Sequence, residues 1–260
     1  MKPPYSPVEL QIVVLARDLA DGEVGFMGGA NSVTSAAACL LARALYAPNL
    51  TIIQPSLFVN PDPVRLLPSI IDGRYQYGAE AVMTWDSIFE MSERGVDFMF
   101  YSGLEVDRFG NFNVHWFGGT DKPQYRGPGL VNVSWTTTAN RYYLYPNRHD
   151  SRRLVEKVEF VSGVGNLTGG EARLRAGINT EGPRLCVTPR AVFDFDSPDR
   201  SMRLVSIHEG WELEDVLEPL PFQPHLASEV AVTEPPTRQE LIFIRNLDGA
   251  SLLGARHFRG

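Results

Sequence analysis

The stretch of residues 98–117, FMFYSGLEVDRFGNFNVHWF, constrains the fold of this chain more than any other. It opens with the uninterrupted apolar run FMFY, which is typical of a central parallel strand buried on both faces. We expect this strand to end at Ser102-Gly103, where polar residues begin. Open α/β sheets bind their ligands beyond the carboxyl ends of their strands. The residues predicted to bind substrate here are Ser102, Gly103, Asn111 and Asn113.

A second strand-turn-helix unit is predicted near the start of the chain. Residues 23–27 read as a strand, Gly28-Gly29 as a turn, and Asn31-Ser32 as the cap of a helix that runs to Tyr46. Such a turn can present backbone N–H groups to an anion or an oxyanion. Two interpretations remain open. Either the glycines only let the helix pack close to the sheet, or Gly28, Gly29 and Asn31 face the substrate.

The rest of the chain predicts alternating helices and strands in one domain, residues 1–260. An amphipathic helix opens at Ser6-Pro7 and stops at Gly22, and a final helix begins at 235–237. Residues 155–163, VEKVEFVSG, alternate as a strand with one exposed face, and residues 226–234 read as a linker.

Composition excludes several classes of partner. The net charge of −7 and the pI of about 5.3 argue against a nucleic-acid partner and against an anionic membrane surface. The two cysteines lie far apart in sequence and form no zinc-ligand pattern. No apolar run approaches the roughly 20 residues of a membrane span, so we predict a cytoplasmic protein. Asp194, Asp196 and Asp199 read as a hairpin turn and not as a calcium loop, and no metal site is predicted.

The segment VDRFGNFN resembles the D-x-x-G-N-x-N turn in β-type subunits of class I CoA-transferases, such as glutaconate CoA-transferase. The likeness continues in YAPN at 46–49, in VEKVEFVSGVGNL, and in the tail TxxELxxIRxLD from Thr237. It implies an α/β fold with a three-layer, open, mostly parallel sheet flanked by helices, of the NagB/RpiA/CoA-transferase type. It also implies an acyl-CoA substrate, no cofactor beyond the CoA moiety, and an α-type partner subunit in an α2β2 assembly.

The resemblance also directs attention to Gln54, which follows the predicted strand at 50–53. Transferases of this family carry a nucleophilic glutamate at that point, and the alignment places it on Gln54 or Pro55. Neither residue is a carboxylate, so neither can form the acyl anhydride and enzyme-CoA thioester of double displacement. The resemblance thus implies a subunit without the usual nucleophile, with Gln54 and Ser56 near the substrate.

Glu105 is the candidate catalytic carboxylate of this chain. A carboxylate in a partly buried cleft can act as a base toward water. The competing interpretation is a salt bridge from Glu105 to Arg108 or to a partner chain. His115 has no serine or cysteine in a G-x-S-x-G elbow, so no hydrolase triad is expected.

The leading functional prediction is a β subunit that opens a cyclic oxoacyl-CoA by C–C hydrolysis, similar to the cholesterol ring-degrading CoA hydrolase of steroid catabolism. This resemblance implies that the working carboxylate comes mainly from the α subunit. Two alternatives stay open. One is conventional transfer of CoA between carboxylic acids, and the other is a non-catalytic subunit that only binds CoA esters, because fold does not fix function.

Overall fold

The computed structural model describes residues 3–28, 33–69, 71–129, 134–249 and 251–255. The chain divides into two compact units. Unit 1 consists of residues 1–101 with 234–260, and unit 2 of residues 102–233. The assignment of residues 1–260 to one domain stays a prediction.

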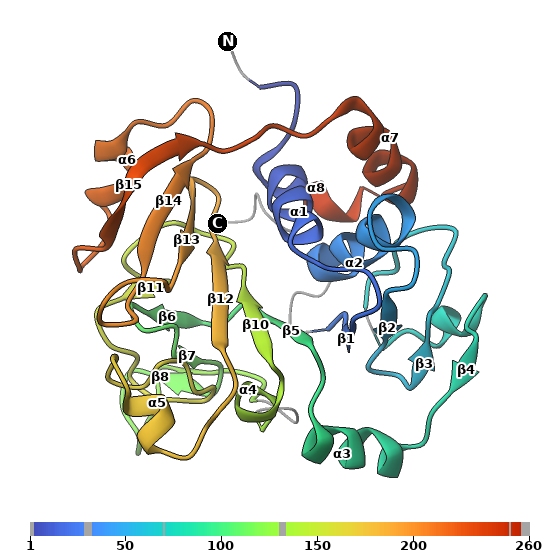
Figure 1. Cartoon of the computed structure of the whole chain (residues 1–260), viewed down its shortest axis with the longest axis horizontal. Coiled ribbons are helices and arrows are strands. Elements are labelled where there is room, and N and C mark those ends of the chain that lie inside the picture. The colour runs from blue at the N-terminus through green and yellow to red at the C-terminus, as the bar shows by residue number, and fades with distance from the viewer. Residues whose placement is uncertain (1–2, 29–32, 70, 130–133, 250, 256–260) are drawn as a thin grey trace. The chain divides into compact units, whose positions relative to one another are not determined.

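The strands of unit 1 are hydrogen-bonded in the order β5-β1-β2-β3-β4 (Figure 1). β1 (Val24–Phe26) pairs in parallel with both β2 (Thr51–Ile53) and β5 (Phe98–Tyr101). β3 (Phe58–Val59) and β4 (Ala81–Val82) extend the sheet in antiparallel fashion. All four residues of β5 are buried, as the apolar run predicts.

Four helices of unit 1 gather together in Figure 1, and they contact one another. They are α1 (Pro7–Arg17), α2 (Val33–Leu45), α7 (Arg238–Leu247) and α8 (Leu252–Ala255). Capping boxes start two of them, from Ser6 with Glu9 and from Thr237 with Glu240. Each box satisfies two backbone N–H groups that a helix start leaves open, which explains why both starts could be predicted. Unit 1 also contains the 3-10 helix η1 (Gly73–Gln76) and α3 (Trp85–Arg94).

The main sheet of unit 2 has the order β10-β12-β13-β14-β15. Its strands are β10 (Arg141–Leu144), β12 (Gly182–Val187), β13 (Ala191–Asp194), β14 (Arg203–Ile207) and β15 (His225–Val232). The pairs β10–β12 and β14–β15 are parallel, and the two pairs between them are antiparallel. The predicted α/β class, with a large sheet flanked by helices, is confirmed.

Smaller elements of unit 2 surround the predicted site. β6 (Glu105–Asp107), β7 (Phe112–Asn113) and β11 (Leu154–Val155) form a three-stranded sheet, and β8 (Trp116–Phe117) pairs with β9 (Tyr125–Arg126). The short helices are α4 (Trp135–Thr138), α5 (Ala172–Arg175) and α6 (Leu213–Leu217).

Two sequence predictions in unit 2 are wrong. Residues 226–234 were predicted as a linker, but most of them belong to β15, an edge strand whose side chains are largely exposed. Backbone hydrogen bonds to β14 hold this strand in place. Because few of its side chains are buried, its sequence has no alternation of apolar and polar residues. Residues 155–163 were predicted as a strand, but only the end of β11 is regular there. Beyond it, the N–H groups of Ser162 and Gly163 bond to the carbonyl of Phe112 instead.

Within the described ranges, no helix is long and apolar enough to cross a bilayer. The cytoplasmic location stays a prediction.

Two buried histidines join the β12–β13 turn to neighbouring elements of unit 2. His149 Nε2 donates to the carbonyl of Val216 (2.8 Å), and its Nδ1 lies 2.8 Å from Thr188 Oγ1. His208 Nε2 donates to the carbonyl of Thr188 (2.9 Å), and its Nδ1 lies 2.9 Å from Thr233 Oγ1. Burial lowers the pKa of each imidazole to about 4, so both rings are neutral in the folded chain at neutral pH.

We expect acid to destabilise the chain through this pair. The unfolded chain takes up a proton on each imidazole near pH 6.5 and the folded chain only near pH 4, so stability is lost as pH falls between these values. The full loss is about 3 kcal/mol per histidine. His208→Gln should flatten the slope of the urea midpoint against pH in this window. Gln223→Asn, at an exposed position of the same unit, is the control. An unchanged slope in His208→Gln would contradict the assignment.

Candidate functional site

The predicted residues of unit 1 lie at the carboxyl ends of two paired strands. Phe26 and Ile53 are register partners at the ends of β1 and β2, and Met27 N–H donates to the carbonyl of Ile53 (3.1 Å). Gly28 and Gln54 follow at the same edge of the sheet, and both are buried. Gly29 and Asn31 lie outside the described residues. The sequence predicted a strand before each of these residues, and the structure adds that the two strands are adjacent, so both residues lie where parallel sheets bind ligands.

Gln54 is the most informative side chain at this edge. It is 0% exposed, and its Oε1 accepts a hydrogen bond from the N–H of Ser56 (2.6 Å). Its Nε2 has no hydrogen-bond partner among the described residues. A buried donor left without a partner costs about 1–3 kcal/mol, so such a group in a native fold calls for an explanation. One explanation is that the amide N–H of Gln54 donates to a ligand that binds at this strand end.

The turn between β5 and β6 in unit 2 requires a glycine at one position. Gly103 has φ = +70°, and a Cβ there would lie 2.9 Å from the carbonyl oxygen of Glu105. Side chains rarely adopt that φ, and the contact leaves no room for one. Ser102, just before it, is buried. The bend predicted at Ser102-Gly103 is present, and it directs the chain into β6.

Asp107 organises the D-x-x-G-N-x-N turn from inside. Its Oδ1 accepts from the N–H groups of Phe109 (2.9 Å) and Asn111 (3.0 Å), and Asn111 Nδ2 donates to both of its oxygens. Burial raises the pKa of Asp107 to about 6, although these hydrogen bonds act in the opposite direction. The first residue of the motif therefore has a structural role in holding the turn.

Asn111 and Asn113 have their amides engaged by protein groups. Asn111 Nδ2 also donates to the carbonyl of Leu167 (2.8 Å), and its Oδ1 accepts from the N–H groups of Gly165 and Leu167. Asn113 Nδ2 donates to Glu105 Oε2 (2.8 Å) and to the carbonyl of Trp116 (2.6 Å). Both side chains fix the loop around Glu105, and their binding of substrate stays a prediction.

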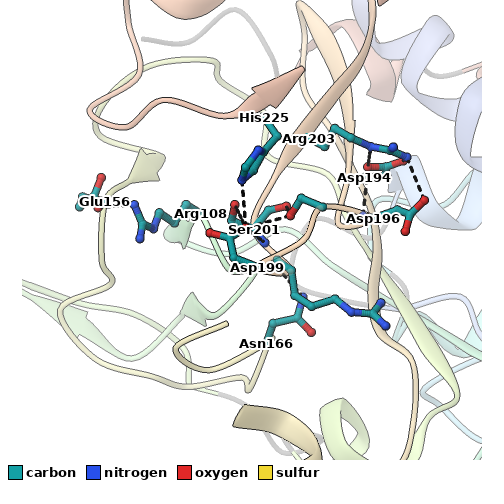
Figure 2. Close-up of polar contacts among 11 residues, drawn as sticks. Arg108, Glu156, Asn166, Asp194, Asp196, Asp199, Ser201, Arg203 and His225 are labelled. Carbon is teal, nitrogen blue, oxygen red and sulfur yellow. Dashed lines mark hydrogen bonds and ion pairs between the residues drawn. The ribbon is translucent and has the colours of Figure 1, made fainter. Parts of the chain in front are cut away.

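Among the described residues, hydrogen-bond donors contact only one of the two carboxylate oxygens of Glu105. Its Oε2 accepts from Asn113 Nδ2 and from the N–H of Glu159 (3.2 Å). The proposed salt bridge to Arg108 is absent among the described residues, because Arg108 pairs with Glu156 (3.0 Å), as Figure 2 shows. Glu105 is thus oriented by neutral donors and half-exposed at the start of β6.

The structure adds a pair that the sequence did not reveal. His115 Nδ1 lies 2.6 Å from Oγ of Ser162, which is buried and also accepts from the N–H of Val114 (2.9 Å). Ser162 Oγ also lies 3.4 Å from Asn113 Oδ1. The pair is therefore linked to Glu105 through the side chain of Asn113. The two residues are far apart in sequence and share no local motif, which is why a search for a serine elbow missed them.

Asp194, Asp196 and Asp199 lie at the end of β13 and in the loop to its antiparallel partner β14, where a hairpin turn was predicted. Arg203 bridges Asp194 (2.6 Å) and Asp196 (3.2 Å), while Asp199 meets His225 (3.1 Å) (Figure 2). In the part of the chain that the structure describes, no group of three or more His, Cys, Asp or Glu side chains could hold a metal ion.

The described residues define an α/β protein with polar groups at strand ends. In unit 1, Gly28 and the buried amide of Gln54 follow adjacent strands, and in unit 2 the carboxylate of Glu105 follows the bend at Gly103. Gln54 and Glu105 belong to different units, so their action in one site stays a prediction.

Comparison with known proteins gives the family. The model for the coenzyme A transferase family matches residues 8–218, so the chain belongs to this family. It is 30% identical to the B subunit of the 3-oxoadipate CoA-transferase from Pseudomonas knackmussii, over 94% of each chain. It is 27% identical to the cholesterol ring-cleaving hydrolase IpdB subunit of Mycobacterium tuberculosis, over 84% of this chain and 85% of that one.

Solved structures agree with this assignment. Glutaconate coenzyme A-transferase from Acidaminococcus fermentans superposes with a TM-score of 0.86 at 25% identity, covering 99% of each chain. The decarboxylase AibA/AibB superposes with a TM-score of 0.83 at 26% identity, covering 96% of this chain and 98% of that one. The predicted resemblance to class I CoA-transferase β-type subunits is therefore confirmed.

We expect Asn111→Ala to unfold the turn before it affects any ligand. The substitution removes a buried amide and leaves the N–H groups of Gly165 and Leu167 without their acceptor. The expected cost is about 2–4 kcal/mol in the free energy of unfolding, measured with urea. Asn179→Ala, at an exposed amide of the same unit, is the control. A variant as stable as the natural chain would show that the turn does not depend on Asn111.

Proposed function

We propose that this chain is the β-type subunit of a two-subunit enzyme that opens a cyclic oxoacyl-CoA by C–C hydrolysis. The observation that carries the proposal is the amide at the end of β2. Residues 54–56 are Gln, Pro and Ser, so this strand end offers no carboxylate for double displacement. The IpdB relative, a ring-cleaving hydrolase subunit, supports hydrolysis as the reaction class.

The chemistry assigned to each residue follows from its hydrogen bonds. Glu105 is oriented through Oε2, which leaves Oε1 to take a proton from water. The resulting hydroxide adds to the ring ketone, and the C–C bond then breaks and passes its electron pair to the leaving carbon. The proton on Glu105 moves to that carbon, so water is consumed and no further cofactor is needed.

The amide of Gln54 supplies a donor that fits this scheme. Its Nε2, which has no partner among the described residues, donates to the oxygen that gains negative charge as hydroxide adds. Donors aimed at a developing oxyanion contribute roughly 3 kcal/mol each. We propose an α-type partner, because the relatives are named as B subunits, and keep the α2β2 stoichiometry that the resemblance to the family implies.

The runner-up is ordinary transfer of CoA between carboxylic acids. The 30% identity to a 3-oxoadipate CoA-transferase subunit favours it, and the nucleophile would then be Glu105 or a glutamate of the α-type subunit. Hydrolysis and transfer differ in one observable, which is a covalent enzyme-thioester intermediate.

We expect Gln54→Glu to introduce that intermediate. With the α-type subunit and acyl-CoA present, borohydride or hydroxylamine should trap a modified glutamate in the variant and none in the natural enzyme. Pro55→Glu tests the alternative alignment, and Gln54→Asn is the matched control that keeps an amide. A trapped glutamate in the natural enzyme would favour transfer and overturn the hydrolytic proposal.

We expect Glu105→Gln to lower kcat for ring opening by roughly 10²–10⁴-fold, which is the usual contribution of a general base. The amide oxygen can still accept from Asn113, so the turn should remain folded. Glu156→Gln, which removes only the exposed ion pair with Arg108, should leave kcat unchanged. Equal activities of the two variants would remove Glu105 from the mechanism.

A further inference from the structure

His115 is connected to the candidate base Glu105 through a single side chain. Asn113 contacts both residues, because its Nδ2 donates to Glu105 Oε2 (2.8 Å) and its Oδ1 accepts from the backbone N–H of His115 (3.0 Å). All three residues belong to unit 2. Imidazole is the side chain that takes part most often in acid-base catalysis, and the steps assigned to Glu105 leave this one without a role.

The hydrogen bonds of Ser162 determine which nitrogen of His115 carries the hydrogen. Ser162 Oγ accepts from the N–H of Val114 (2.9 Å), and its own hydroxyl hydrogen has two acceptors in range. His115 Nδ1 lies at 2.6 Å, whereas Asn113 Oδ1 lies at 3.4 Å, beyond the usual range for a hydroxyl donor. The hydroxyl therefore donates to Nδ1. A neutral ring that accepts at Nδ1 carries its hydrogen on Nε2.

The ring of His115 is held in place, and its Nε2 stays open among the described residues. Phe160 packs edge-on against the half-exposed imidazole, with 5.2 Å between the ring centroids. Nε2 has no hydrogen-bond partner in the described part of the chain. A Cβ on Gly129 would lie 3.3 Å from Nε2, so the glycine leaves room for a ligand atom beside this donor.

We propose that His115, as a neutral imidazole with its hydrogen on Nε2, is a catalytic hydrogen-bond donor to the substrate. The proposal rests on the hydrolytic function proposed above and adds a residue to it. Breaking a C–C bond leaves an electron pair on carbon, and a neighbouring carbonyl group must take up that charge as an enolate. In a cyclic 3-oxoacyl-CoA, this group is the thioester carbonyl. Donors aimed at a developing enolate oxygen stabilise the transition state.

The step balances without a further group. His115 Nε2–H donates to the enolate oxygen, and the hydrogen stays on the nitrogen. Glu105, which took a proton from water, gives it to the leaving carbon, while the ketone carbon keeps the hydroxide and becomes a carboxylic acid. Ser162 acts through His115 as a positioning residue, because its hydroxyl keeps the hydrogen of the ring on Nε2.

The first test measures the tautomer on the full chain alone. Long-range ¹H–¹⁵N correlation spectra at alkaline pH, where imidazoles are neutral, distinguish the two ring nitrogens. The signals of His115 are those that His115→Gln removes. His208, whose Nε2 donates to the carbonyl of Thr188 (2.9 Å), gives the reference pattern in the same spectrum. We expect the hydrogen of His115 on Nε2, and a hydrogen on Nδ1 would overturn the proposal.

The same spectra test Ser162. Ser162→Ala removes the donor to Nδ1, so the ¹⁵N resonance of that nitrogen should shift. Ser151→Ala, at an exposed serine of the same unit, should leave it in place. An Nδ1 resonance that does not move in Ser162→Ala would overturn the positioning role.

The second test measures ring opening by the complex with the α-type subunit. The probe is 2-oxocyclohexane-1-carboxyl-CoA, which hydrolysis converts into a linear dicarboxylic acid linked to CoA at one end. His115→Ala should lower kcat roughly 10²–10³-fold, as loss of one oxyanion donor does, with a smaller change in KM. His115→Gln, which offers an amide N–H in place of Nε2–H, should retain more activity than His115→Ala. Glu156→Gln is again the exposed control.

The outcomes separate the proposal from the function on which it rests. An unchanged kcat in His115→Ala, beside a lowered kcat in Glu105→Gln, overturns the role of His115 and leaves the hydrolytic function intact. A natural complex that transfers CoA through a trapped glutamate means that the hydrolytic function has failed, whichever tautomer the spectra show.

Discussion

The carboxyl group of Asp107 is the constraint on which the candidate site of unit 2 depends. It gathers the N–H groups of the turn that follows β6, and so it sets the path of the chain from Glu105 to Asn113. Gly110 at the tip has φ = +74°, and a Cβ there would lie 2.8 Å from the ring of Pro183. Turn and sheet therefore fit closely. Glu105 begins the same strand, and its Oε2 accepts from Asn113 Nδ2, at the far end of the turn that Asp107 holds.

Elements with strong local signals could be predicted from the sequence. The capping boxes at Ser6 and Thr237 and the apolar run of β5 each specify one conformation through neighbouring residues. β15 could not be predicted, because a strand exposed on both faces has no apolar period and is defined by its pairing with β14. Its formation depends on a distant partner, which a local pattern does not encode.

The candidate site shows the same division. That Gly28 and Gln54 each follow a strand could be predicted, but the pairing of the two strands, which brings these residues to one edge of the sheet, is seen only in the fold. The roles of the polar turn residues could not. Asn111 and Asn113 are polar residues of a type that often binds ligands, but their side-chain amides donate to backbone carbonyl groups of the protein itself. The pairing of His115 with Ser162 needed the folded chain, since it joins β-sheet loops far apart in sequence.

The framework around Gln54 explains how one family fold can support more than one reaction. β1 and β2 are held by backbone hydrogen bonds, and the only hydrogen bond that the Gln54 side chain makes with described residues is to the N–H of Ser56. A glutamate could accept the same bond without disturbing the sheet. The side chain after β2 is thus free to change while the strands stay in register. Relatives named as transferases, a ring-cleaving hydrolase and a decarboxylase share this framework. A carboxylate at that position can serve as the nucleophile of acyl transfer, whereas a neutral amide cannot, and the hydrolytic function proposed above therefore assigns the attack to water.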